Sequence, residues 1–150
     1  MRAVVQRVLE GQVKVSGEVI GEIGKGYVIF LGVADTDTRE IADKMAKKIL
    51  GLRIFDDEND KINLSLNDVD GEILLISQFT LYAQCKKGNR PSFVEAGKPD
   101  FANELYEYMI EVLSAGCKHV GHGEFGADMK VSLINDGPFT IYLDSEQLGF

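Results

Sequence analysis

The sequence predicts an α/β protein in which one compact domain, residues 1–150, contains mixed, largely antiparallel sheets and two main helices. Three observations lead to this fold class. The first third of the chain consists of short apolar segments separated by glycines, which is typical of strands joined by hairpins. Two later segments have the apolar periodicity of amphipathic helices. The total length of 150 residues is about that of one domain.

The β-rich first third ends in a segment, Tyr27–Ala34, that is almost continuously apolar. A strand of this kind is usually covered on both faces, so we expect it at the centre of a sheet. The residues that divide the preceding chain into short strands are Gly11, Gly17, Gly21, Gly24 and Gly26.

Two amphipathic helices are predicted. The first follows Asp37, which can cap it with Glu40 as the reciprocal partner three residues later. The second begins near Pro99, which suits a first helical turn, and ends near Gly116. The apolar stripes that would face the core are Ile41, Met45 and Ile49 in the first helix, and Phe101, Leu105, Met109 and Val112 in the second.

The segment Arg53–Leu66 is predicted to form a strand, an acidic turn and a second strand. Its acidic cluster suggests a calcium loop, but an EF-hand needs glycine at its sixth position and glutamate at its twelfth. Counting from Asp56, these positions hold Lys61 and Asn67. We therefore expect a solvated turn. The next apolar segment, Gly71–Ala83, is predicted as another buried strand.

Two or three final strands are predicted between Lys118 and Leu143, and Gly137-Pro138 interrupts them. Proline cannot donate a hydrogen bond to a sheet, so this dipeptide should break the ladder. Asn-Asp-Gly followed by an ordinary residue would have made an adequate hairpin. The sequence therefore raises the question why a rigid residue follows the most permissive one.

Composition limits the possible partners. The net charge of −8 argues against general affinity for nucleic acid, because phosphate binding needs a local density of cations. The segment Ala83–Lys98, however, carries four cations against Glu95, a net charge of +3 that leaves −11 elsewhere. Such a basic loop could contact a phosphate end.

The sequence shows no membrane or secretion signal. No apolar run reaches the roughly 18 residues that a membrane span needs, and the amino-terminal residues have no signal-peptide pattern. We therefore expect no membrane partner. Cys85 and Cys117 form no CxxC pair, so we expect two free thiols and a reducing cytoplasm.

Side chains suited to catalysis are few. His119, His122 and Glu124 are close in sequence and could bind a metal, but strand alternation would place the two histidines on opposite faces. We expect neither a metal nor another cofactor. The segment Ser77–Leu81 remains, where backbone amides could leave the sheet and face a ligand. Such donors would suit acyl transfer, although a capped strand end explains the same pattern.

Four segments together resemble one known family. The segments SQFTL, KKGNRPSF, FGADMKVSLINDGP and RIFDDENDKINLSL are similar to those of D-aminoacyl-tRNA deacylases, the D-tyrosyl-tRNA deacylase family. The similarity extends over the whole chain, although Phe139 stands where the family pattern GPVT has valine. The resemblance implies a cytoplasmic homodimer with β/β/α layers. It also implies hydrolysis of the ester that joins a D-amino acid, or mischarged glycine, to the tRNA 3′ end.

The resemblance also implies roles for individual residues. In the family the Gly-Pro peptide is cis and enters the partner's active site, so Gly137 and Pro138 would exclude L-amino acids from the neighbouring subunit's pocket. The catalytic segment would comprise Ser77, Gln78, Phe79 and Thr80, with backbone amides holding the carbonyl oxygen. The pocket would be lined by Ala102, Phe125 and Met129. From their charge, and not from the resemblance, we expect that Lys86, Lys87 and Arg90 could contact acceptor-stem phosphates.

Alternatives remain open from the sequence alone. The resemblance implies that the 2′-hydroxyl of the terminal ribose assists the attacking water, and the alternative is that Thr80 acts as a nucleophile. The chain could instead hold tRNA ends without turnover. A metal-dependent hydrolase using His119, His122 and Glu124 is a further alternative.

Overall fold

The computed structural model describes residues 1–150 and confirms the predicted fold class. The helices are α1 (Arg39–Leu50) and α2 (Pro99–Gly116), with 3₁₀ turns η1 (Asn67–Val69) and η2 (Phe79–Tyr82). The strands are β1 (Arg2–Val15), β2 (Glu18–Ile23), β3 (Gly26–Gly32), β4 (Arg53–Asp56), β5 (Ile62–Ser65), β6 (Glu72–Ser77), β7 (Val120–His122) and β8 (Met129–Asp144). Strand β1 pairs antiparallel with β2, β3 and β8, whereas β3, β6 and β7 pair in parallel.

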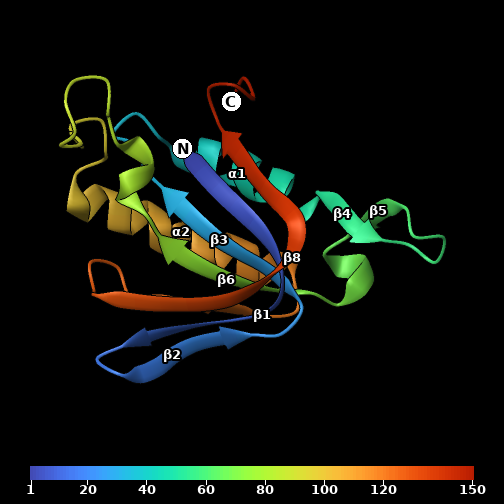
Figure 1. Cartoon of the computed structure of the whole chain (residues 1–150). Coiled ribbons are helices and arrows are strands. Elements are labelled where there is room, and N and C mark those ends of the chain that lie inside the picture. The colour runs from blue at the N-terminus through green and yellow to red at the C-terminus, as the bar shows by residue number, and fades with distance from the viewer.

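The strands and helices form the three layers that the resemblance implies (Figure 1). The long strands β1 and β8 bend together, so each contributes one half to the middle sheet and the other half to the outer sheet. Together with β2, β3, β6 and β7 they form one continuous hydrogen-bonded sheet; we call its part with β3, β6 and β7 the middle sheet and its part with β2 the outer sheet. Helices α1 and α2 cover the remaining face of the middle sheet. The predicted hairpin of β4 and β5 is confirmed and projects from one end.

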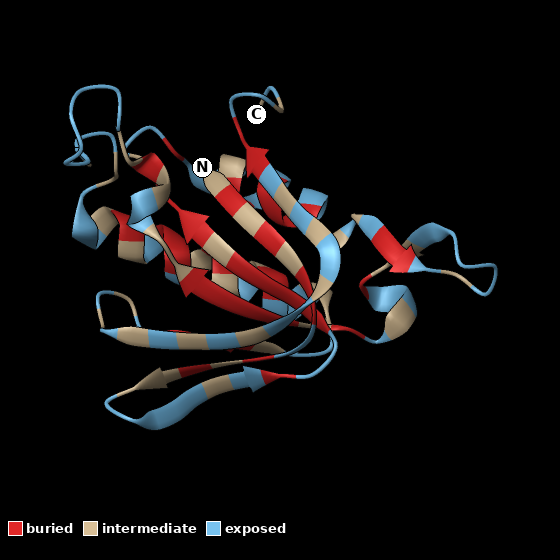
Figure 2. Ribbon diagram, viewed as in Figure 1, coloured by how far each residue is buried: buried red, intermediate tan, exposed pale blue.

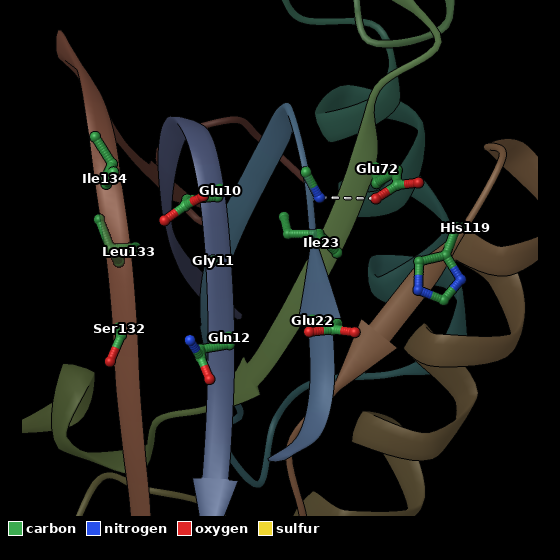
Figure 3. Close-up of a pocket in the computed structure, with 11 residues that line it drawn as sticks. Glu10, Gly11, Gln12, Glu22, Ile23, Glu72, His119, Ser132, Leu133 and Ile134 are labelled. Carbon is green, nitrogen blue, oxygen red and sulfur yellow. Dashed lines mark hydrogen bonds between the residues drawn. The ribbon is translucent and has the colours of Figure 1, made fainter.

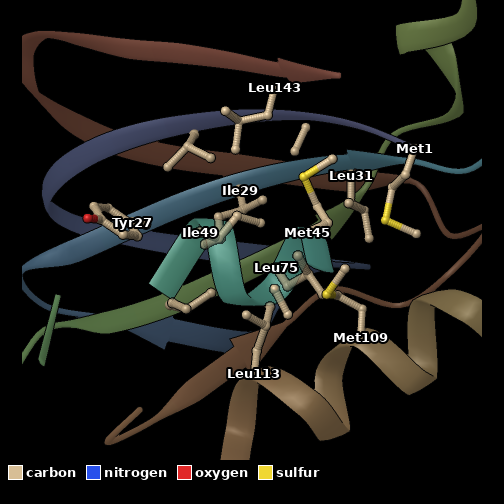
Figure 4. Packing of buried hydrophobic residues seen from close by; sticks show 14 of the residues in the cluster. Met1, Tyr27, Ile29, Leu31, Met45, Ile49, Leu75, Met109, Leu113 and Leu143 are labelled. Carbon is tan, nitrogen blue, oxygen red and sulfur yellow. The ribbon is translucent and has the colours of Figure 1, made fainter. Parts of the chain in front are cut away.

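Two apolar cores explain why β3 and β6 are almost continuously apolar. Side chains alternate across a strand, so Ile29 and Leu75 enter the larger core beneath the helices (Figure 4). Their neighbours Val28 and Leu74 enter a second core between the two sheets. The colouring by burial shows both strands buried along nearly their whole length (Figure 2). The predicted covering on both faces is therefore confirmed.

The glycines of the first third do not all divide strands. Gly11 was predicted to separate two segments but lies inside β1, opposite Ile23 of β2 and Leu133 of β8. A β-carbon there would lie 2.7 Å from Cγ2 of Val28, so only glycine allows β1 to pack this closely on β3. The hairpin prediction is correct for the turn at Gly17, between β1 and β2.

The two predicted helices are present, with one corrected cap. Helix α1 is capped by Thr38, whose hydroxyl accepts from the Ile41 amide (3.2 Å), and not by Asp37. The Asp37 carboxylate is buried and accepts hydrogen bonds from the Ala34 amide and the amino group of Met1. Helix α2 begins at Pro99, as predicted. Neither helix is long and apolar enough to cross a membrane.

The strand predicted over Gly71–Ala83 is shorter than expected. Strand β6 ends at Ser77, and the chain leaves the sheet at Gln78 to form η2. The last ladder bond joins the Gln78 amide to the Leu31 carbonyl (2.8 Å). Residues 79–82 therefore lie beyond the edge of the middle sheet.

Gly137-Pro138 interrupts the ladder, as predicted, but it does not divide β8 into two strands. Strand β8 is continuous from Met129 to Asp144, and both halves pair with β1 in the same direction. The register moves from Val8 opposite Asn135 to Gln6 opposite Thr140, so four residues bulge out opposite Arg7. The proline lies inside this bulge, where the ladder needs no amide proton from it. Its peptide bond with Gly137 is cis.

Candidate functional site

A cavity of about 590 Å³ opens where β6 ends, and we call it the η2 pocket. It lies between the start of η2, the loop before α2, the first turns of α2 and the segment after β7. It contains five of the predicted site residues, which are Ser77, Gln78, Phe79, Ala102 and Phe125. The only charged side chains among its 16 lining residues are Asp35 and Lys98, both exposed. The other lining residues are uncharged and most of them are apolar, as is usual for ligand sites.

The backbone at the start of η2 offers two free hydrogen-bond donors. The amides of Phe79 and Thr80 donate no hydrogen bond within the chain, because the first amides of a helical turn have no preceding carbonyl to reach. The predicted Gln78 amide is not available, since it is bonded to Leu31. Two adjacent donors at the edge of an apolar pocket could hold a developing oxyanion.

The Thr80 side chain has no partner that could activate it. Its hydroxyl accepts a hydrogen bond from the side-chain amide of Gln78, and an amide cannot remove a proton. Thr80 is also absent from the residues that line the η2 pocket. The geometry therefore lacks the adjacent base that a threonine nucleophile requires.

The Tyr106 hydroxyl connects α2 with β6 and with the segment after β7, and this contact was not anticipated from the sequence. Tyr106 is buried in α2, and its hydroxyl lies 2.9 Å from the Leu75 carbonyl and 3.1 Å from the Gly123 carbonyl. Burial raises the pKa of this phenol well above its usual value, so the hydroxyl remains a donor. Its ring lies 6.0 Å from that of Phe125, which lines the pocket.

Several predicted site residues lie outside the pocket of their own chain. Met129 is not a lining residue; it packs beside Gly123 and against the core between the sheets. Gly137 and Pro138 are exposed in the bulge of β8 and do not line the η2 pocket. The residues predicted to contact phosphates, Lys86, Lys87 and Arg90, are exposed and form no ion pair. Their loop also contributes Phe93 and Val94 to the lining of the pocket.

The bulge around Gly137-Pro138 is fixed by residues that the sequence analysis did not identify. The Arg7 guanidinium contacts the Asp136 carboxylate (3.0 Å) and lies over the Phe139 ring, 4.1 Å from its centroid. The Asn135 side chain donates to the carbonyls of Arg7 and Phe139. The sequence did contain a signal for Arg7. In an alternating strand Arg7 shares a face with Ala3 and Val5, which are buried, so a charged residue is predicted at a buried position.

The proposed metal ligands do not converge. His119 precedes β7, His122 ends it and Glu124 lies in the following turn, and all three are exposed. The Nδ1–H of His122 donates to the Gly123 carbonyl (2.9 Å). No three histidine, cysteine or acidic side chains lie close enough to hold an ion together. The geometry thus gives the metal-dependent alternative no support.

A second cavity of about 580 Å³, which we call the acidic groove, lies between the outer sheet and the start of β6. It is lined by carboxylates from three strands, Glu10, Glu22 and Glu72, with His119 nearby (Figure 3). One Glu72 oxygen accepts from the Gly24 amide (2.9 Å). No lysine or arginine lines it, so it would repel phosphate.

Comparison with known proteins identifies the family. Residues 4–144 match the family model described as D-Tyr-tRNA(Tyr) deacylase. Proteins named D-aminoacyl-tRNA deacylase from Lactobacillus acidophilus (56% identity; 96% of this chain, 99% of that protein) and Clostridium novyi (52%; 98% and 99%) are similar over nearly full length.

Two solved structures have the same fold. A protein described as c-Myc DNA Unwinding Element Binding Protein superposes with a TM-score of 0.90 at 43% identity, covering 96% of this chain and 98% of that one. A probable eukaryotic D-amino acid tRNA deacylase superposes with a TM-score of 0.81 at 20% identity, covering 95% and 98%. These matches confirm the resemblance seen in the sequence, and the chain belongs to the D-Tyr-tRNA(Tyr) deacylase family, as a hydrolase acting on aminoacyl-tRNA esters.

Proposed function

We propose that the η2 pocket is where the chain hydrolyses D-aminoacyl-tRNA. Water attacks the ester carbonyl carbon, the bond to the ribose 3′-oxygen breaks, and the products are a free D-amino acid and tRNA with its 3′-hydroxyl restored. The observation that carries the proposal is the pair of free amides of Phe79 and Thr80 beside the η2 pocket. They would hold the carbonyl oxygen as it becomes negative.

The attacking water would be assisted by the substrate and not by a side chain of the pocket. Histidine is absent from the lining residues, and Asp35, the only carboxylate, accepts from the Lys98 amide (2.8 Å). The 2′-hydroxyl of the terminal ribose adjoins the ester and could orient the water. Thr80→Ala should then keep near-normal single-turnover rates, whereas tRNA ending in 2′-deoxyadenosine should react slowly. Full activity on the deoxy substrate would contradict assistance by the ribose.

Selection for D-amino acids would depend on a homodimer. In this proposal Gly137 and Pro138 of one subunit enter the η2 pocket of the other, where their carbonyls occupy the space that an L side chain needs. Their exposure supports this role, as does their absence from the pocket of their own chain. Glycine has no side chain to exclude, so mischarged glycyl-tRNA would also be hydrolysed.

The basic loop would bind the tRNA, and the protein would act in the cytoplasm. Lys86, Lys87 and Arg90 are exposed, carry no paired carboxylate and belong to the loop that forms one wall of the η2 pocket. Cations so placed could contact acceptor-stem phosphates while the 3′ end occupies the pocket.

The decisive experiment is a paired assay with D-tyrosyl-tRNA, L-tyrosyl-tRNA and glycyl-tRNA. We expect release of D-tyrosine and glycine and little release of L-tyrosine. Binding without release would favour the alternative of a module that only holds tRNA ends. Equal release of both tyrosine enantiomers would contradict the exclusion mechanism. Activity that is lost in chelator and restored by zinc would revive the metal-dependent alternative.

A further inference from the structure

The η2 turn is too short to fix its own orientation. It comprises four residues, and isolated single turns are unstable in water. Its start is tied to the middle sheet by the hydrogen bond from the Gln78 amide to Leu31. Its end is tied by the Leu81 carbonyl, which accepts a hydrogen bond from Nη1 of Arg2 (3.0 Å). The free amides of Phe79 and Thr80 lie between these two attachments.

Arg2 is itself held from three sides. Its Nε donates to Oδ2 of Asp144 (3.1 Å), and its guanidinium lies 4.3 Å from the centroid of the Tyr82 ring. The Asp144 carboxylate is 8% exposed and also accepts from the Tyr142 hydroxyl (3.0 Å) and the Glu146 amide (3.0 Å). The carboxylate that orients the guanidinium is thus itself held by two hydrogen bonds from its own segment.

The Asp144 carboxyl group is ionised near neutral pH. Burial alone would raise the pKa of Asp144, but hydrogen bonds from the Glu146 amide, the Tyr142 hydroxyl and Arg2 outweigh it and lower the pKa below its usual value. A planar guanidinium can donate to Leu81 and Asp144 together, in fixed directions. A lysine ammonium keeps the charge, but as a compact point charge on a flexible stem it cannot reproduce this geometry.

We propose that Arg2 is a positioning residue for deacylation, which fixes η2 so that the amides of Phe79 and Thr80 point at the ester carbonyl. The inference rests on the proposed function of the η2 pocket. Arg2 does not line the pocket, so it acts through the turn and not on the substrate. Small misplacements of catalytic donors lower the rate more than they lower affinity, because the donors act mainly on the transition state.

The test compares Arg2→Lys with Arg39→Lys. Arg39 is an exposed arginine on α1 that also contacts a carboxylate (Glu104, 3.0 Å) and an aromatic ring (Tyr108, 4.9 Å), but both of these partners lie on α2 and not on η2. We expect Arg2→Lys to lower the single-turnover rate on D-tyrosyl-tRNA by roughly tenfold or more. Affinity for tRNA carrying D-tyrosine through a 3′-amide should stay within about twofold, and Arg39→Lys should change neither quantity.

A second variant keeps the test decisive if Arg2→Lys folds poorly. Asp144→Asn retains Arg2 but removes the charge that orients it, and should lower the rate in the same direction. The double variant should lose less than the two single effects combined, because both act through one contact. Altered amide NMR shifts of Phe79 and Thr80 in either single variant would report the moved turn directly.

Other outcomes would overturn the inference. These are an unchanged rate in both single variants, a loss that appears only as weaker binding, or a lower melting temperature with a normal rate per folded molecule. If the wild-type chain releases no D-tyrosine at all, the proposed function fails first, and that result is distinct from failure of the role of Arg2.

Discussion

The η2 pocket and the acidic groove have nearly the same volume, about 590 and 580 Å³, but opposite chemistry. The pocket is lined mostly by apolar side chains, and two free backbone amides lie at its edge beside a basic loop. The groove presents three glutamates and no lysine or arginine. A substrate with a phosphate chain and an ester carbonyl needs cations and hydrogen-bond donors, so only the pocket suits it.

The comparison also shows where donors come from in a chain with few reactive side chains. In the groove Gly11 and Gln12 of β1 are paired on both sides, with β2 and β8, and the Gly24 amide is bonded to the Glu72 carboxylate. At the pocket β6 leaves the sheet and turns, which releases amides that no carbonyl can reach. A strand end can thus supply binding groups that no side-chain motif would reveal.

The largest expected effect comes from removing one free amide. Proline suits the first position of a helical turn, so Phe79→Pro should retain η2 but lose the amide proton. Phe79→Ala loses the same ring and keeps that proton, which makes it the matched control. We expect kcat of the proline variant to fall about a hundredfold below that of the alanine variant. Equal kcat values, with both variants folded, would remove the Phe79 amide from the mechanism.

The basic loop beside the pocket should have the next largest effect. Replacing Lys86, Lys87 and Arg90 together with alanine should weaken tRNA binding by about tenfold at moderate salt. The slope of log affinity against log salt should fall by roughly 0.7–0.9 for each phosphate that these cations neutralise in the wild-type complex. Lys47→Ala with Lys48→Ala, on the exposed face of α1, serves as the control. An unchanged salt slope in the triple variant would contradict binding of phosphate by this loop.

A smaller effect is expected from the Tyr106 hydroxyl, which joins α2 to β6 and to the segment after β7. Tyr106→Phe should lower the free energy of unfolding by about 1 kcal/mol and the single-turnover rate by no more than about fivefold. The effect should be modest because both carbonyls keep another donor, the Gly123 amide for Leu75 and His122 for Gly123. Urea unfolding and single-turnover kinetics would measure both. A loss above a hundredfold would give Tyr106 a direct catalytic role.

The smallest effect is expected in the groove. Glu10→Gln combined with Glu22→Gln removes two exposed charges and should leave kcat/KM for D-tyrosyl-tRNA within about twofold. Any change should be a slight gain at low salt, because the net negative charge that opposes tRNA is reduced. A tenfold loss would mean that the groove, and not the η2 pocket, contacts the substrate.

Local patterns in the sequence were enough to predict the sheets and helices. Continuous apolar runs predicted that β3 and β6 are covered on both faces, and helical spacing predicted α1 and α2. The cap at Thr38 was missed because Asp37 has an equally suitable side chain, which a tertiary contact with Met1 engages instead.

The site was only partly predictable, because its geometry depends on contacts between distant segments. The residues QFTLYA read as a continued strand, and no local propensity separates a strand from a 3₁₀ turn there. Arg2 and Asp144 are 142 positions apart, so no pattern along the chain could connect them with η2. The bulge of β8 likewise depends on pairing with β1, and not on residues near Gly137 alone.

The middle sheet places a constraint on how this chain can change. Consecutive residues of β6 belong to different cores, Leu74 to the one between the sheets and Leu75 to the one under the helices. Deleting a single residue before β6 would exchange the two sets and misfit both at once. Variation in length should therefore be tolerated in the β4–β5 hairpin, which projects from the layers, and eliminated from the strands that lead into η2.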